Sequence, residues 1–288
     1  MAARLIDGKA IAEQIHAETA AAIARLKAEH NLKPGLAVIL VGDNPASLAY
    51  VSSKDKMCVR LGIHSLRVNL PAKTTEGELL AKINDLNFDR TIHGILVQAP
   101  LPAHIDEDAI FAAIDPSKDV DGFHPLNVGK IALGDTTGFA PCTPAGVHQL
   151  LVRSNVPVEG AHVVVLGRSR IVGRPVSLIL SQKNVNATVT VAHSRSRDLP
   201  ALCRSADILV AAIGQPKFVK AEMVRDGAVV IDVGINRVDG KLVGDVDFET
   251  VSQKASQITP VPGGVGPMTI AMLMHNTVRA AKLRHGID

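Results

Sequence analysis

The chain has 288 residues, of which 47% are hydrophobic and 20% charged, so it can bury a substantial core and lacks the composition of a disordered protein. Its net charge of +3 is small, and with no Trp, one Tyr and six Phe we expect no aromatic stacking platform for single-stranded nucleic acid. We therefore expect one large or two medium globular domains without a nucleic-acid partner.

The cysteines and histidines form neither a disulfide pattern nor a metal-binding pattern. Cys58, Cys142 and Cys203 lie far apart in the sequence, which indicates a reduced, cytoplasmic setting. The eleven histidines have no HExxH or paired-ligand spacing, so we expect no metal site. No apolar run reaches the ~20 residues that span a bilayer, and residues 1–22 do not resemble a signal peptide, so no membrane partner is expected.

Strand and helix patterns alternate along the first half of the chain. The expected elements are a helix over 11–30, a strand over 36–41, a helix over 46–61, a strand over 65–70, a helix over 75–86 and a strand over 92–97. This alternation predicts a parallel sheet with helices on both faces. Ligands of such sheets bind beyond the carboxyl ends of the strands, so the loops that follow the strands are the candidate sites.

Tyr50 and Lys54 lie on the helix that follows the first of these strands. Their spacing of four residues places them on one helix face. A surface pair fits that spacing, and so does a lysine that acts on a bound substrate. Because a lysine becomes a general acid or base only where its surroundings lower its pKa, the spacing alone leaves both interpretations open.

Two further strand-end loops carry polar side chains. Gln98 precedes the rigid Pro100 turn, so its amide is either exposed or aimed at a ligand. Asp115, Asp119 and Asp121 lie in the next loop, but their spacing does not match a calcium-binding loop. A carboxylate that accepts hydrogen bonds from a polar heterocycle fits this loop better than a metal site does.

The second half of the chain repeats the alternation. The expected elements are a helix to Ser154 with Thr143 as its N-cap, strands over 163–166, 188–192, 208–213 and 229–233, and a final helix over 270–283. Cys142 has no base beside it in the sequence, so a buried structural thiol fits it better than a nucleophile does. The repeated rhythm favours a doubly wound nucleotide-binding domain.

The turn after the strand 163–166 combines glycines and arginines. A dinucleotide fingerprint has glycines at its first, third and sixth positions, where this chain has Gly167, Ser169 and Val172. The turn precedes a helical pattern, and the N-terminus of a helix attracts an anion. By itself, this window is compatible with a nucleotide site and with an ordinary turn between a strand and a helix.

The loop after the strand 188–192 indicates which dinucleotide would bind. An NAD site has an acidic residue there, which accepts hydrogen bonds from the ribose, but this chain has Ser194 and Arg195. With Arg168 in the glycine turn, these residues could hold a 2′-phosphate. The two loops together favour NADP over NAD.

Residues 259–269 contain three prolines and three glycines. Such a segment is expected to be neither helix nor central strand. Its glycines let the backbone approach a ligand closely, so a binding loop is favoured over a plain linker.

Six windows, taken together, resemble the bifunctional methylenetetrahydrofolate dehydrogenase/cyclohydrolase family. They are Tyr50–Lys54, Gln98–Pro102, Asp119–Pro125, Pro141–Gly146, Gly167–Pro175 and Pro262–Thr269. Their order is that of the family, and the resemblance covers nearly the whole chain. Ala99 stands where the family has Leu, which matters little because Pro100 restricts the backbone before it.

The resemblance implies an α/β protein of two domains with the active cleft between them. Residues 1–143, joined by the helix 270–288, would form a folate-binding catalytic domain. Residues 144–269 would form a Rossmann-like, doubly wound NADP-binding domain. The family forms homodimers through its nucleotide domains.

The resemblance also implies two reactions. Methylenetetrahydrofolate, with or without a polyglutamate tail, would be oxidised by NADP to the methenyl cation, and water would open this cation to 10-formyltetrahydrofolate. Lys54 would be the main catalytic group, tuned by Gln98, with Tyr50 against the folate and Asp121 on the pterin. The cofactor would contact Gly167, Arg168, Ser169, Ser194 and Ile235, and the loop residues Pro262 and Gly263 would contact the substrate.

Three alternatives remain to be distinguished. A short-chain dehydrogenase also uses a YxxxK motif, but there the motif follows the glycine turn, whereas Tyr50 precedes Gly167. A family member with only the dehydrogenase activity could keep the same motifs. A folate- or nucleotide-binding regulatory protein without turnover is disfavoured because Lys54, Gln98 and Asp121 are all present.

Overall fold

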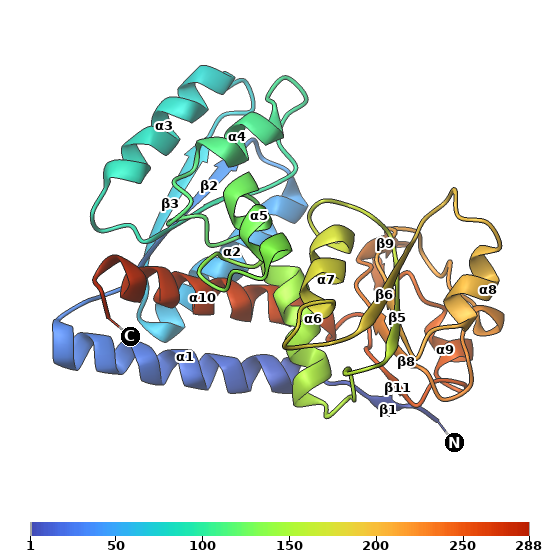
Figure 1. Cartoon of the computed structure of the whole chain (residues 1–288). Coiled ribbons are helices and arrows are strands. Elements are labelled where there is room, and N and C mark those ends of the chain that lie inside the picture. Colours follow the sequence, from blue (N-terminus) through green and yellow to red (C-terminus); the bar gives the residue numbers. More distant parts are fainter. Residues whose placement is uncertain (1, 288) are drawn as a thin grey trace. The chain divides into compact units, whose positions relative to one another are not determined.

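The computed structural model describes residues 2–287, which form two compact units (Figure 1). We call them the three-stranded unit, Gln14–Ala140 with Ile270–Asp288, and the six-stranded unit, Met1–Glu13 with Pro141–Thr269. The expected α/β fold class is confirmed, because each unit contains a parallel sheet with helical connections. Among the residues described, no helix has both the length and the apolar character of a membrane span.

The three-stranded unit has a parallel sheet of order β3-β2-β4. Its elements are most of α1 (Gly8–His30), β2 (Gly35–Val41), α2 (Pro45–Leu61), β3 (His64–Leu70), α3 (Glu76–Phe88), β4 (Gly94–Val97), α4 (Glu107–Ala113), α5 (Pro125–Leu133) and most of α10 (Val265–Arg284). Every residue of the central strand β2 is buried, which explains its continuous apolar run.

Helix α3 shows how the sequence specifies an element of this unit. Thr75 and Glu78 form a capping box at its N-terminus, which satisfies backbone N–H groups that have no partner within the helix. Leu79, Ile83 and Leu86 recur at helical spacing and are buried. They pack with strand residues and with α4 in one core, and Figure 1 shows α3 and α4 on the same side of β2 and β3.

Lys118 is a buried cation that the sequence analysis did not single out. Its side chain is 1% exposed, and its Nζ donates to the carbonyl oxygens of Leu86 and Asp89, each at 2.7 Å. These carbonyls lie at the C-terminal end of α3, where a cation is favoured. Burial, followed by the charge of Arg284, lowers the pKa of Lys118 to about 8.

We expect Lys118→Met to lower the free energy of unfolding by about 1–3 kcal/mol, because it leaves buried carbonyl oxygens without their donor. Urea denaturation followed by circular dichroism measures this loss. The exposed Lys27 supplies the matched control, Lys27→Met, for which little change is expected. Equal stability of the two variants would show that Lys118 does not cap α3.

The six-stranded unit has a parallel sheet of order β1-β11-β8-β7-β5-β6 and a separate antiparallel hairpin, β9-β10. Its strands are β1 (Arg4–Leu5), β5 (His162–Leu166), β6 (Thr188–Ala192), β7 (Ile208–Ala211), β8 (Val229–Asp232), β9 (Asn236–Val238), β10 (Lys241–Val243) and β11 (Gln257–Ile258). Its helices include α6 (Cys142–Arg153), α7 (Gly173–Leu180), α8 (Leu199–Arg204), the 3-10 helix Ala221–Met223 and α9 (Phe248–Val251).

The strand order of this sheet reverses at β5, which has β6 on one side and β7 on the other. Ligands of doubly wound sheets bind at such a switch point.

The unit boundary at the N-terminus differs from the expected division at residues 143 and 144. Residues Met1–Glu13 belong to the six-stranded unit, because Arg4 and Leu5 pair in parallel with Gln257 and Ile258. A two-residue strand is too short to leave a periodic signal in the sequence. The second boundary falls at Pro141, three residues before the expected one.

Two helix starts also differ from expectation. Helix α6 begins at Cys142 with Pro141 as its cap, so Thr143 is not the N-cap; its Oγ1 instead lies 2.8 Å from Thr269 Oγ1. Helix α10 begins at Val265, so the expectation that residues 259–269 exclude helix is wrong for their second half. Pro267 is tolerated there because the first turn of a helix has N–H groups without intrahelical partners.

Candidate active site

The three-stranded unit buries a lysine beside a glutamine. Lys54 lies on α2, which follows β2, and is 6% exposed. Its Nζ donates to Oε1 of Gln98 at 2.9 Å. Gln98 directly follows β4, and its backbone N–H donates to the carbonyl oxygen of Ile39 on the neighbouring strand at 2.9 Å. Both side chains therefore lie at the carboxyl edge of this sheet, where a parallel sheet presents ligand sites.

The Gln98 amide is oriented by a second hydrogen bond. Its Nε2 donates to the Ala99 carbonyl at 2.7 Å, which leaves Oε1 facing Lys54. Tyr50, one turn before Lys54, is 40% exposed, and burial of the rest of its ring raises its pKa. The surface-pair interpretation of Tyr50 and Lys54 is therefore wrong for the lysine, because its side chain is buried and bonded to Gln98.

Asp119 builds the loop that contains Asp121. The carboxylate of Asp119 is buried and accepts from the backbone N–H groups of Gly122, Phe123 and His124 and from the Asn127 amide. Burial raises the pKa of this carboxyl, and the Asn127 side chain is the largest influence that lowers it. Asp119 is thus a structural residue of this loop. Asp121 is less buried than Asp119.

The glycine turn of the six-stranded unit is closely packed. A Cβ on Gly167 would lie 2.1 Å from the Ala212 carbonyl oxygen, and one on Gly173 would lie 2.3 Å from the Gly167 oxygen. Gly167 has φ of 125°, which other residues rarely adopt. These glycines let β5, the turn and the start of α7 approach closely, as the dinucleotide fingerprint requires.

Ser169 accepts hydrogen bonds from the backbone at the start of the helix that follows this turn. Its Oγ accepts from the N–H groups of Val172 and Gly173 at 3.2 and 3.3 Å. A hydroxyl that accepts two hydrogen bonds still has its own proton to donate. Ser169 can therefore donate to a phosphate oxygen at the N-terminus of α7, where the helix dipole favours an anion.

Arg168 and Ser194 follow two neighbouring strand ends. Leu166 at the end of β5 pairs with Ala192 at the end of β6, and the Gly167 N–H donates to the Ala192 carbonyl at 2.8 Å. Both Arg168 and Ser194 are exposed. The sheet register thus brings the two predicted phosphate-binding loops to one edge.

The loop 259–264 packs against the start of α1. A Cβ on Gly8 would lie 1.8 Å from the Gly264 carbonyl oxygen, and one on Gly263 would lie 3.4 Å from the Lys9 side chain. The N-terminal segment therefore approaches the backbone of Gly263 and Gly264 closely. Ile235, after β8, is 47% exposed and lies close to Gly266.

Sequence reasoning missed a pair of buried carboxylates in the six-stranded unit, Asp232 and Asp245. Asp232 ends β8 and is 3% exposed, and Asp245 is 0% exposed. Asp232 accepts from the backbone N–H groups of Gly234, Asp245 and Val246. Burial raises the pKa of Asp232 to about 7, with a smaller contribution from the charge of Asp245, against the three donors that lower it.

The raised pKa of Asp232 predicts a pH-dependent stability. The folded chain keeps this proton up to about pH 7, whereas an unfolded aspartate loses it near pH 4. Asp232 therefore lowers the free energy of unfolding progressively as the pH rises through that window. Urea denaturation at several pH values measures this slope, which we expect to be reduced in Asp232→Asn and retained in Asp247→Asn. An unchanged slope in Asp232→Asn would contradict the assignment.

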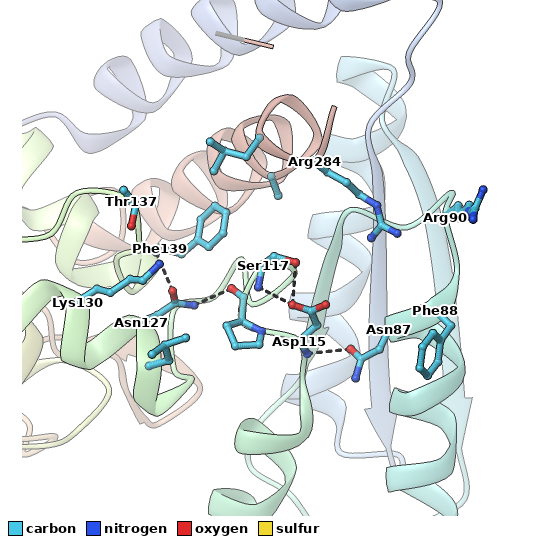
Figure 2. Close-up of a pocket in the computed structure, with 14 residues that line it drawn as sticks. Asn87, Phe88, Arg90, Asp115, Ser117, Asn127, Lys130, Thr137, Phe139 and Arg284 are labelled. Carbon is cyan, nitrogen blue, oxygen red and sulfur yellow. Dashed lines mark hydrogen bonds between the residues drawn. The ribbon is translucent and has the colours of Figure 1, made fainter. Parts of the chain in front are cut away.

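The structure also has a surface pocket of about 780 Å³ in the three-stranded unit. Figure 2 shows the hydrogen bonds of Asp115 with Ser117 and Asn87 inside it. Arg90, which lines this pocket, precedes β4, whereas Gln98 follows it. The pocket therefore belongs to the amino edge of the sheet, and no residue of the predicted site lines it.

The chain has the features of an α/β dinucleotide-binding enzyme. They are a sheet with a switch point, a glycine turn that leads into a helix, and a second unit with a buried lysine. Two family models match the chain: the catalytic domain of tetrahydrofolate dehydrogenase/cyclohydrolase over residues 6–121, and its NAD(P)-binding domain over residues 141–285. The chain therefore belongs to the tetrahydrofolate dehydrogenase/cyclohydrolase family.

Individual relatives are similar over almost their full lengths. The bifunctional protein FolD 2 of Geobacter sulfurreducens is 56% identical, with 98% of each chain covered. The bifunctional FolD structure from Campylobacter jejuni is 53% identical with a TM-score of 0.95, covering 98% of this chain and 100% of that one. The FolD structure from Trypanosoma brucei, complexed with NADP and an inhibitor, is 40% identical with a TM-score of 0.94 and 99% of each chain covered.

Proposed function

We propose that this chain oxidises 5,10-methylenetetrahydrofolate to the methenyl cation with NADP and then hydrolyses that cation to 10-formyltetrahydrofolate. Full-length similarity to bifunctional FolD proteins supports both activities. The observation that carries the hydrolytic step is the buried Lys54–Gln98 pair, whose Nζ and Oε1 are 2.9 Å apart. The burial and this hydrogen bond hold the Lys54 amine in one position, whereas an exposed lysine side chain would rotate freely.

The hydrolytic step needs a positioned water and a proton acceptor, because the methenyl carbon is already electrophilic. Water adds to that carbon, a C–N bond of the ring breaks, and one proton is released. We assign the proton transfer to Lys54 in its neutral form, which a cationic substrate would favour by repelling a charged ammonium. Gln98 would position Lys54 by accepting from its Nζ.

The glycine turn fits the dinucleotide that this family binds. The space beside Gly167 and Gly173 is too small for a Cβ, so only a glycine backbone can form this turn. Arg168 and Ser194 would hold the 2′-phosphate of NADP. Gly167 and Ser169 would hold its diphosphate, and Ile235 would contact the rest of the cofactor. When held by these residues, NADP would supply the hydride acceptor.

The other substrate contacts follow from the family resemblance and from exposure. Tyr50 would pack on the folate with its exposed face, and Asp121 would accept hydrogen bonds from the pterin, which the loop formed by Asp119 supports. Pro262 and Gly263 would add backbone contacts from a loop that is held in place by the start of α1.

We further propose a cytoplasmic homodimer that accepts folates with or without a polyglutamate tail. Among the described residues, β6 has a strand neighbour on one side only, and its Val191 is 40% exposed. An exposed strand edge favours pairing with another chain, which supports association through the six-stranded unit. Light scattering during gel filtration tests the dimer.

One spectrophotometric assay tests the two activities. With methylenetetrahydrofolate and NADP, we expect NADPH to form while the methenyl absorbance stays low, because hydrolysis removes the cation. NADPH formation with accumulating methenyl product would indicate a dehydrogenase without the hydrolase. The absence of NADPH formation and of methenyl hydrolysis would contradict the proposal.

A further inference from the structure

We propose that Asp245, supported by Asp232, is a positioning residue for the nicotinamide half of bound NADP. This inference rests on the proposed function, and it concerns two carboxylates that do not themselves need to touch the cofactor. Their role would be to hold the loops after β7 and β8 at the carboxyl edge of the six-stranded sheet in one arrangement.

Asp245 connects the loops that follow β7 and β8. Its Oδ2 accepts from the backbone N–H groups of Ile213 and Gly214 at 2.7 and 2.9 Å, and its Oδ1 accepts from the Asn236 side chain at 2.9 Å. Ile213 and Gly214 follow β7, whereas Asn236 begins β9 after the β8 loop. One buried carboxylate thus holds two successive strand-end loops.

Asp232 extends this network to the third loop. Its backbone N–H donates to Thr259 Oγ1 at 2.7 Å, and Thr259 is where the loop 259–264 begins. The Asp232 carboxylate accepts from Gly234 at 3.0 Å and from the backbone N–H of Asp245 at 2.9 Å. The two carboxylates therefore link the loops after β7 and β8, and the backbone of Asp232 adds a contact to the loop after β11.

Gly234 and Gly244 leave the space that the Asp232 and Asp245 carboxyl groups occupy. A Cβ on Gly244 would lie 1.8 Å from Asp232 Oδ2, and one on Gly234 would lie 2.4 Å from the Asp245 carboxyl group. The hairpin β9-β10 pairs Asn236 with Val243, and so returns the chain to place Asp245 beside the β8 loop. The two glycines and the hairpin together allow both carboxylates to be buried beside the loops that they contact.

The position of these loops points to the nicotinamide half of the cofactor. In a doubly wound sheet the two halves of a dinucleotide bind on either side of the switch point. The phosphate-binding loops predicted here follow β5 and β6, whereas the Asp245 loops follow β7 and β8, on the other side of β5. Ile235, the proposed cofactor contact, lies between Gly234 and Asn236, whose positions Asp232 and Asp245 hold.

The test compares Asp245→Asn with the matched control Asp247→Asn. Asp247 pairs with Lys220 at 3.1 Å and has no side-chain hydrogen bond to these loops among the interactions described. An asparagine at position 245 retains the shape of the side chain but has one accepting oxygen in place of two, so it cannot accept from the Ile213 and Gly214 N–H groups and from the Asn236 NH₂ group at the same time. Calorimetry with NADP and with adenosine 2′,5′-bisphosphate, which is its adenine half, separates the two ends of the cofactor.

We expect Asp245→Asn to weaken NADP binding at least tenfold, while adenosine 2′,5′-bisphosphate binding and methenyl hydrolysis without NADP stay within twofold of wild type. Asp247→Asn should match wild type throughout. If Asp245→Asn fails to fold, Asn236→Ala removes a single donor to the same carboxylate, and we then expect a threefold or greater selective weakening of NADP binding.

Two results would overturn the inference. NADP affinity within twofold of wild type in Asp245→Asn, or in Asn236→Ala where that variant replaces it, would show that the loops do not depend on this carboxylate. Equal weakening of NADP and of adenosine 2′,5′-bisphosphate would indicate general loosening of the unit instead of positioning. The proposed function would fail separately, through a wild-type protein that neither reduces NADP nor hydrolyses the methenyl substrate.

Discussion

Replacing Lys54 by Met is expected to lower the rate of methenyltetrahydrofolate hydrolysis by about 10²–10⁴-fold, the usual contribution of a general acid or base. Methionine has nearly the length of lysine but neither accepts a proton nor donates to Gln98. Because the Lys54 side chain is buried, an apolar replacement should be tolerated by the fold. The decay of methenyl absorbance without NADP measures the hydrolytic step alone.

The same helix provides the control for this variant. Lys56 is exposed, so Lys56→Met makes an identical chemical change two residues away and should leave hydrolysis near the wild-type rate. Unfolding by urea should confirm that both variants remain folded. Normal hydrolysis in Lys54→Met would remove the lysine from the mechanism and leave the Lys54–Gln98 hydrogen bond with a structural role.

The second large effect is expected in cofactor choice. Arg168→Ala combined with Ser194→Ala should raise the KM for NADP by about 10²–10⁴-fold, because charge-assisted hydrogen bonds contribute about 1.5–3 kcal/mol each, two such contacts are removed, and about 1.4 kcal/mol corresponds to a factor of ten. NAD lacks the 2′-phosphate, so its KM should change by about twofold or less. Initial rates of methylenetetrahydrofolate oxidation with each dinucleotide give both values.

Arg197 supplies the control for the cofactor variant. It is exposed and lies in the same loop as Ser194, so Arg197→Ala removes a positive charge nearby without removing a proposed phosphate contact. A general electrostatic effect would appear in both variants. Equal increases in the KM for NADP and NAD in the double variant would reject the 2′-phosphate site at Arg168 and Ser194.

Much of the parallel α/β architecture could be predicted from local patterns. The strand predicted over 188–192 matches β6, and the strand predicted over 36–41 differs from β2 only by Gly35. Strand β2 is the central strand of its parallel sheet and is buried on both faces, so it is apolar at every position and stands out in the sequence. The short strand β1 has no such signal, because only its pairing with β11 defines it.

The candidate site was predictable where residue spacing alone places groups together. Tyr50 and Lys54 share a helix face because they lie four residues apart, and Gly167 and Ser169 belong to one turn. Asp232 and Asp245 were not predictable in this way. Their hydrogen bonds depend on a hairpin that folds the chain back, and no local pattern specifies which carboxylate becomes buried.

The sequence by itself determined the alternation of strands and helices, the tight glycine turn and the order of the motifs, since each depends on side chains that are near one another along the chain. Only the tertiary structure decided that Lys54 is buried with its Nζ against Gln98, a residue 44 positions away. That contact requires β4 to pair beside β2. The pairing brings two strand ends together, which turns an ambiguous lysine on a helix into a candidate catalytic group.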